Sequence, residues 1–148
     1  MNSLRAGSFS EETNVPTRFS VKSPGRGWTY EQTRWLWKQA EELGFYSVLH
    51  NDHMYGSTLE GWTTLAAMFS QTESIRGGTM VTSNSFRHPS ILAKMIATVD
   101  IISNGRLSVG LGTGNEAEEY QTYGLKFPSP SDRVEQLAET CEILTRSW

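Results

Sequence analysis

The feature that most constrains this chain is a pattern that occurs four times: a short apolar or β-branched run, a polar loop, and then a helical periodicity. The predicted strands cover residues 17–21, 45–49, 75–81 and 106–111. Repeated alternation of strands and helices favours parallel strands joined by right-handed crossovers. The sequence therefore predicts the α/β class.

Helix signals follow each predicted strand. Thr29 opens the first helix with Gln32 three residues on, which is a capping-box signature, and Gly44 suits its end. Pro89 suits the first turn of the third long helix, and a short helix is expected over residues 116–122. The apolar stripes expected to face the core are Leu36, Ala40 and Leu43; Trp62, Leu65, Ala66 and Phe69; Leu92, Met95, Ile96, Val99 and Ile102; and Val134, Leu137, Ala138, Cys141 and Leu144.

The length of the repeating unit leaves two architectures open. From Pro16 to the last residue the four units take about 33 residues each, close to the ~30 of a βαβ module. Eight such units make a barrel of ~250 residues, so this chain would be about half of one. Four or five units can also complete a small doubly wound sheet, which length alone favours.

Residues 1–15 are polar and without periodicity, and we expect a flexible leader there.

Charge and composition narrow the possible partners. The chain has 13 Lys and Arg against 16 Asp and Glu, a net charge of -3, so neither nucleic acid nor an anionic membrane is an expected partner. No apolar run approaches the ~18 residues of a membrane span, and the polar start lacks the apolar core of a signal peptide. The single cysteine, Cys141, is placed in the core and excludes an intrachain disulfide and a thiolate metal cluster. We therefore expect a soluble, cytoplasmic protein.

Polar residues follow all four predicted strands. In parallel α/β folds the functional groups lie in loops at the carboxyl ends of the strands. Here those loops contain Ser23-Pro24, Asn51-Asp52-His53, Thr82-Ser83-Asn84 and Thr113-Gly114-Asn115. Such groups would orient an uncharged or anionic heteroaromatic ligand, although loops are often polar without any such role.

Among these residues, the adjacent Asp52 and His53 are the strongest candidates for proton transfer. An imidazole can pass a proton near neutral pH, and an adjacent carboxylate can bias its tautomer. The competing interpretation is a structural histidine at a strand end. A metal site built from His50, His53 and His88 is less favoured, because no carboxylate motif accompanies these residues and helix entry accounts for His88.

Glycines surround the fourth predicted strand. Residues 110–114 have the spacing GxGxG, which lets the backbone approach a ligand but differs from the GxGxxG of nicotinamide dinucleotide folds. Gly77 and Gly78 are expected to weaken the third strand. The five tryptophans are assigned to packing rather than to a cofactor site.

Several linked segments resemble one known family. They are AEELGFYSVLHNDH, then LEGWTTLAAMFSQTESIRGGTMVTSNSFRHPSILAKMIATVDIISNGRLSVGLGTGNEAEEYQTYGLKFP, then DRVEQLAETCEILTRSW. In this order and without large gaps they resemble the luciferase-like monooxygenase superfamily, and within it the flavin- or deazaflavin-dependent oxidoreductases. The resemblance runs from about Arg18 to Trp148.

The resemblance implies a (β/α)8 TIM barrel with reduced FMN or the deazaflavin coenzyme F-420 at its carboxyl-end rim. It also implies hydride transfer or oxygen activation on a small organic substrate. Asp52 and His53 match the family's pair after strand two, with His53 as acid or base. The cofactor ring would contact Met80 and Val81, which match a non-proline cis peptide in strand three, and Thr113, Gly114 and Asn115 in the loop after strand four. Asn115 stands where relatives often have an aromatic or acidic residue, so the resemblance does not choose between the cofactors.

Residues 16–148 match only the N-terminal half of such a barrel. A half-barrel leaves strands one and four as edges and exposes the face meant for the interior. We consider three hypotheses: a truncated piece of a longer enzyme, two copies associated into a full barrel, and a non-catalytic association module.

Overall fold

The computed structural model describes residues 16–56 and 58–147, so the expected leader lies outside the described residues. Its centre is a four-stranded parallel sheet in the order β1-β2-β3-β4. The strands are β1 (Ser20–Lys22), β2 (Ser47–His50), β3 (Arg76–Ser83) and β4 (Leu107–Gly112). Consecutive strands are neighbours, with helical connections between them, as the repeated sequence pattern predicts. The α/β class is confirmed.

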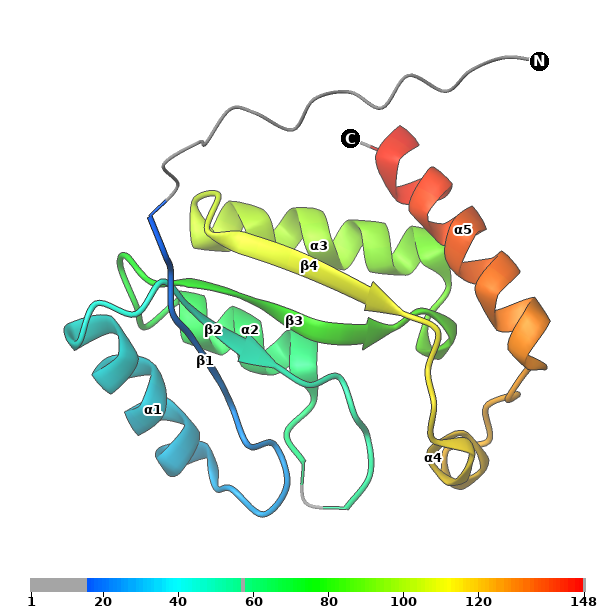
Figure 1. Cartoon of the computed structure of the whole chain (residues 1–148), viewed down its shortest axis with the longest axis horizontal. Coiled ribbons are helices and arrows are strands. Elements are labelled where there is room, and N and C mark those ends of the chain that lie inside the picture. Colours follow the sequence, from blue (N-terminus) through cyan, green and yellow to red (C-terminus); the bar gives the residue numbers. More distant parts are fainter. Residues whose placement is uncertain (1–15, 57, 148) are drawn as a thin grey trace, which may run out of the picture.

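The helices alternate with the strands. They are α1 (Tyr30–Glu42), α2 (Gly61–Phe69), the 3-10 turn η1 (Asn84–Phe86), α3 (Pro89–Ser103), α4 (Ala117–Thr122) and α5 (Pro130–Arg146). In Figure 1 the sheet lies in front of α2 and α3, so the view looks onto the face of the sheet that these helices do not cover. None of the helices in the described part of the chain has the length and apolar character that crossing a membrane requires.

The predicted cap of α1 is confirmed. The Gln32 amide donates to Thr29 Oγ1 at 3.3 Å, and the Thr29 amide donates to Gln32 Oε1 at 2.9 Å. These two bonds satisfy donors that the first helical turn leaves without intrahelical partners. The first strand is displaced from its predicted position: it begins at Ser20, because only residues 20–22 pair with β2.

The hydrophobic core lies between the sheet and α1, α2 and α3. Side chains alternate between the two faces of a strand, and Val48 of β2 points into this core. Trp37 and Trp62 are its largest fully buried side chains, and the indole of Trp62 donates to Thr82 Oγ1 at 3.1 Å. Assignment of tryptophan to packing holds for these two, whereas Trp35 is exposed and Trp148 lies outside the described residues.

Gly77 and Gly78 lie within β3, which is the longest strand of the sheet. A Cβ atom at Gly77 would overlap Met68 Cε, and one at Gly78 would overlap the carbonyl oxygen of Ser108. Both glycines therefore permit close approach, of α2 on one face of the sheet and of β4 beside it. Glycine therefore has a packing role at both positions, because a side chain at either one would meet these neighbours.

Five residues expected in the core are exposed: Leu43, Ile102, Val134, Ala138 and Cys141. Leu43 is 72% exposed, Val134 is 61% exposed, and Cys141 lies on the exposed side of α5. In α1 the buried positions are instead Thr33, Trp37 and Ala40. The apolar face of α5 is mostly uncovered because nothing in the described chain packs over its outer side beyond β4.

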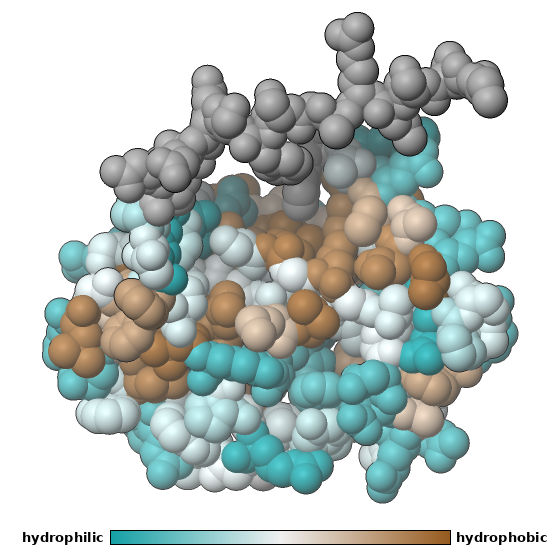
Figure 2. Space-filling view, viewed as in Figure 1, coloured by the Kyte–Doolittle hydropathy of each residue, from teal (hydrophilic) through white to brown (hydrophobic). Residues whose placement is uncertain are grey.

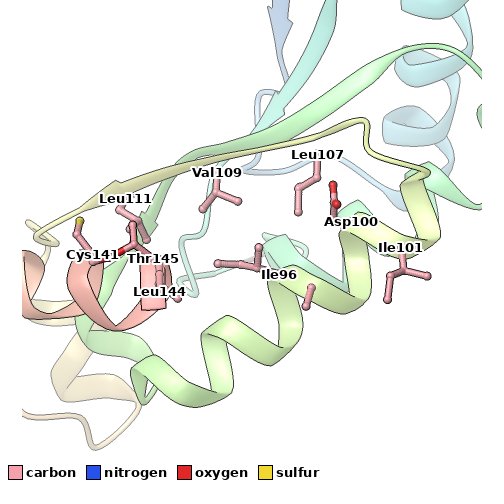
Figure 3. A pocket seen from close by; sticks show the side chains of 10 residues that line it. Ile96, Asp100, Ile101, Leu107, Val109, Leu111, Cys141, Leu144 and Thr145 are labelled. Carbon is pink, nitrogen blue, oxygen red and sulfur yellow. Dashed lines mark hydrogen bonds between the residues drawn. The ribbon is translucent and has the colours of Figure 1, made fainter. Parts of the chain in front are cut away.

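An apolar groove of about 620 Å³ lies beside the edge strand β4. Its walls come from α3, from β4 and from α5, as Figure 3 shows. The residues that line it are Ile96, Ala97, Asp100, Ile101, Leu107, Val109, Leu111, Cys141, Leu144 and Thr145. The groove is on the helix-covered side of the sheet, at the place where a fifth strand would continue it.

Candidate functional site

A second cavity, of about 350 Å³, lies at the carboxyl ends of the four strands. Each strand or its following loop contributes to it: the residues are Lys22, Asn51, Asp52, His53, Met80, Val81, Ser83, Phe86, Gly112, Thr113, Gly114, Asn115 and Glu119. All seven site residues named from the sequence line this one cleft. The carboxyl-end position follows from parallel strand direction, which brings these loops to the same rim.

Met80 and Val81 form an apolar wall of the cleft. Their peptide bond is cis, as the resemblance implies, and the side chains are 47% and 48% exposed on the uncovered face of the sheet. A Cβ at Gly112 would lie 2.5 Å from Val81 Cγ2, and one at Gly110 would lie 3.1 Å from Val81 Cγ1. The glycines of β4 thus leave the space that Val81 occupies. Figure 2 shows hydrophobic side chains gathered across the middle of this face, with hydrophilic ones at its periphery.

The loop after β4 is held in place by contacts of Gly114 with α4 and α5. Gly114 has φ +76, and a Cβ there would overlap the hydroxyl of Tyr120. That hydroxyl is 2.5 Å from Ser83 Oγ in a fully buried hydrogen bond. Arg133 of α5 donates to the Gly114 carbonyl oxygen. Thr113 and Asn115 are therefore held at the rim on a rigid turn that only glycine fits.

The imidazole ring of His53 has a hydrogen-bond partner at one edge and a stacked aromatic ring on one face. Its Nδ1 lies 3.0 Å from Glu119 Oε2, and its ring stacks on Tyr55 with the centroids 4.8 Å apart. Glu119 is 2% exposed, and its other oxygen accepts the Met54 amide. The guanidinium of Arg26 covers Tyr55 at 4.4 Å. The imidazole thus enters the cleft from a fixed position.

Asp52 has a different partner from the one that its sequence position favours. Its carboxylate accepts two hydrogen bonds from Arg87, at 2.5 and 2.8 Å, and Arg87 also donates to Glu60 at 2.6 Å. Burial raises the pKa of Asp52, and the hydrogen bonds and charge of Arg87 oppose that rise. The carboxylate that contacts the His53 ring is Glu119.

Arg87 joins three segments around the cleft. Glu60 caps α2 by accepting the amides of Trp62 and Thr63, and its pKa is lowered because these bonds and Arg87 outweigh its burial. Burial acts to lower the pKa of Arg87, but the bonds and charges of Asp52 and Glu60 raise it. The loop after β2, the start of α2 and the segment before α3 are therefore tied together by one cation.

Sequence reasoning missed Glu119 and Arg87. Glu119 is one of three acidic residues in the predicted short helix, and periodicity alone does not tell which of them turns inward. Arg87 precedes His88 and Pro89, and this pair predicts only the start of a helix. Both pairings join residues far apart in the chain, 66 positions for Glu119 and His53 and 35 for Arg87 and Asp52.

The other histidines do not line the cleft. His50 is buried on the helix side, where its Nε2 accepts the Trp37 indole N–H at 3.0 Å, and burial lowers its pKa to about 4. His88 caps α3 by accepting the Ser90 amide. Across residues 16–56 and 58–147, no group of three His, Cys, Asp or Glu side chains is arranged to hold a metal ion.

Comparison with known proteins agrees with the resemblance read from the sequence. The family model "Luciferase-like monooxygenase" matches residues 13–148. An F420-dependent glucose-6-phosphate dehydrogenase of Microbacterium testaceum is 31% identical over 141 residues, which are 90% of this chain and 42% of that protein. The chain thus spans about two-fifths of the length of this relative.

Solved structures with the same fold bind both kinds of cofactor. An F420-dependent secondary alcohol dehydrogenase in complex with an F420-acetone adduct has a TM-score of 0.78 at 24% identity, over 88% of this chain and 42% of that one. The oxygenating constituent of 3,6-diketocamphane monooxygenase from Pseudomonas putida, in complex with FMN, has a TM-score of 0.77 at 21% identity, over 88% and 39%. At these identities the likeness establishes the fold, which is part of a luciferase-like TIM barrel.

Proposed function

Because the chain belongs to the luciferase-like monooxygenase family, we propose that its cleft binds the ring system of a flavin or deazaflavin. The chain would then take part in oxidoreduction of a small organic substrate. The observation that carries the proposal is the convergence of an apolar wall, Met80 and Val81, and an imidazole, His53, in one cavity of about 350 Å³. Sites for small molecules combine such walls with a few fixed polar groups.

The residues present fit a flat heteroaromatic ring. Half-exposed Met80 and Val81, the apolar wall of the cleft, form an apolar bed on which one face of the ring can lie. Thr113 and Asn115 place a hydroxyl and an amide along the rim, on the turn that Tyr120 and Arg133 fix. A planar ring with polar edges needs this combination of an apolar face and rim hydrogen bonds.

Of the two cofactors, we propose the deazaflavin F-420. The support is the relative that is 31% identical over 90% of the chain, which is an F420-dependent dehydrogenase. The structure in complex with FMN is 21% identical and supports the fold alone. FMN is the second candidate, because the same apolar bed suits either ring.

The chain's own residues would bind, orient and move a proton. When bound, a deazaflavin exchanges a hydride with the substrate, whereas a reduced flavin activates oxygen. His53 would hold or release a proton at Nε2, toward the cleft. Asp52, with both oxygens on Arg87, would keep the loop that carries His53 in place.

A fluorescence titration of the 148-residue chain with F-420, and separately with FMN, tests the proposal. Wild type is expected to bind F-420 saturably. Val81→Asp places a carboxylate on the apolar bed and is expected to abolish binding, because a buried charge without a partner is strongly disfavoured.

Val134→Asp is the matched control. Val134 is exposed on α5 and does not line the cleft, so this variant is expected to bind F-420 as wild type does. Circular dichroism checks that all three proteins are folded. Lack of saturable binding by folded wild type, or equal binding by Val81→Asp, would contradict the proposal.

We further propose that two copies of the chain associate. β1 and β4 are the outer strands of a wholly parallel sheet, so a two-fold axis can set β4 of each copy beside β1 of the other. One copy spans 42% of the length of its dehydrogenase relative, so two supply the strands of one closed barrel. The groove of Figure 3 opens at the β4 edge, where the added strand would cover Leu107, Val109 and Leu111.

Sedimentation of two variants of α3 tests the association. Ile101 is 80% exposed and lines the groove, so Ile101→Glu is expected to shift the chain from dimer to monomer without unfolding it. Ile91→Glu, on the same helix and outside the groove, is expected to remain dimeric. A wild-type chain that stays monomeric at high concentration would overturn this proposal and leave the groove to another chain or segment.

A further inference from the structure

We propose that Glu119 is a positioning residue that fixes the tautomer of His53. It keeps the proton on Nδ1 and leaves Nε2 as the proton acceptor that faces the cleft. This inference rests on the proposed role of His53 in proton transfer. It adds the residue that determines whether Nε2 of the neutral imidazole accepts a proton or donates one.

The hydrogen bonds of Glu119 carry the inference. One oxygen of Glu119 accepts a hydrogen bond from the Met54 backbone amide, which can only donate. The other oxygen lies 3.0 Å from His53 Nδ1. An ionised carboxylate has only acceptors, so beside an ionised Glu119 Nδ1 is the donor of this pair. Because Glu119 is 2% exposed, no bulk water competes for these positions.

Turning the His53 ring by 180° about its Cβ–Cγ bond would place Cδ2 where Nδ1 lies and would break the hydrogen bond to Glu119. Tyr55 stacks on its face at an interplanar angle of 28°, and Thr58 Oγ1 holds the loop by donating to the carbonyl oxygens of His53 and Tyr55. Nε2 has no hydrogen-bond partner among the described residues, and the side chain is 31% exposed. Nε2 is therefore the ring atom available to a ligand.

Neither neighbouring carboxylate can replace Glu119. Both oxygens of Asp52 are engaged by Arg87, and Glu60 is bonded to Arg87 and to the amides at the start of α2. A second partner that orients a histidine fixes which nitrogen is basic. An imidazole with its proton on Nε2 could donate to a substrate hydroxyl but could not accept its proton.

The test is the tautomer of His53 in the free chain, read from the ¹⁵N shifts of its two ring nitrogens. The measurement is made at pH 8.5, above the ordinary histidine pKa of about 6.5. Wild type is expected to carry the proton on Nδ1. His50, whose Nε2 accepts the Trp37 indole, gives an internal reference for the same tautomer.

Glu119→Gln is expected to invert the tautomer. The amide oxygen must accept the Met54 N–H, which leaves the amide NH₂ to donate to Nδ1 and moves the ring proton to Nε2. The shifts of the two nitrogens would exchange. Glu118→Gln, the adjacent exposed position of α4, is the matched control and is expected to keep the wild-type pattern.

The outcomes separate this inference from the proposed function. A proton on Nε2 in wild type, or an unchanged tautomer in Glu119→Gln, would overturn the role of Glu119 whether or not the chain binds a cofactor. The F-420 titration of wild type is a separate measurement, because the tautomer is read in the free chain. Failure of that titration in wild type would contradict the proposed function and leave the tautomer result standing.

Discussion

His50 and His53 are three positions apart in the chain, yet their rings have opposite environments. His50 is the last residue of β2 and points to the helix side, against Trp37. His53 lies beyond the strand end, in the loop that enters the cleft. The environment, not the residue type, decides that one ring is locked in the core and the other is available for chemistry.

The buried His50 makes the stability of the fold dependent on pH. Its pKa falls from 6.5 to about 4 because burial disfavours the charged ring. Between these values the unfolded chain binds a proton that the folded chain does not, so stability falls as the pH drops through this window. At pH 4.5 this ring is expected to remove roughly 2–3 kcal/mol of the stability present at neutral pH.

Urea unfolding of wild type and His50→Gln at pH 7 and pH 4.5 measures this contribution. Glutamine can still accept the Trp37 indole N–H and does not titrate, so the variant is expected to lose less stability on acidification. His88→Gln, at an exposed helix cap, is expected to keep the wild-type loss. Equal losses in wild type and His50→Gln would contradict the account.

At the scale of elements, β3 and β4 owe their close fit to glycine. The sequence predicts the order of strands and helices well, because each unit carries its own periodicity and caps. It does not reveal that Gly77 and Gly78 are packing positions, since their neighbours Met68 and Ser108 come from other elements. The exposed face of α5 escapes prediction for the same reason: an apolar stripe is buried only where another element meets it.

The two glycines of β3 are expected to differ in their tolerance of alanine. At Gly78 the added Cβ meets the backbone carbonyl of Ser108, which cannot move without shifting β4. At Gly77 it meets the flexible end of Met68. Gly78→Ala is therefore expected to lower the free energy of unfolding by about 1–3 kcal/mol or more, and Gly77→Ala by less. Chemical denaturation measures both, and the reverse order would contradict this packing argument.

At the scale of the whole molecule, the sheet separates two cavities. The apolar groove lies on the helix-covered side, where Leu107, Val109 and Leu111 point. The cleft lies at the carboxyl-end rim of the opposite face, lined by Met80 and Val81. The rim could be predicted from strand direction, and the resemblance named its residues. The partners Glu119 and Arg87 could not be predicted, because their contacts arise only when distant loops meet.

The central claim is that the ring binds in the cleft and not in the larger groove. Methyl-labelled chain, observed by NMR during titration with F-420, tests it most directly, because both cavities carry methyl groups. The account predicts saturable shifts at Met80 and Val81, with Leu107, Val109 and Leu111 unaffected. Shifts confined to the three groove residues would contradict it and move the ligand to the opposite face of the sheet.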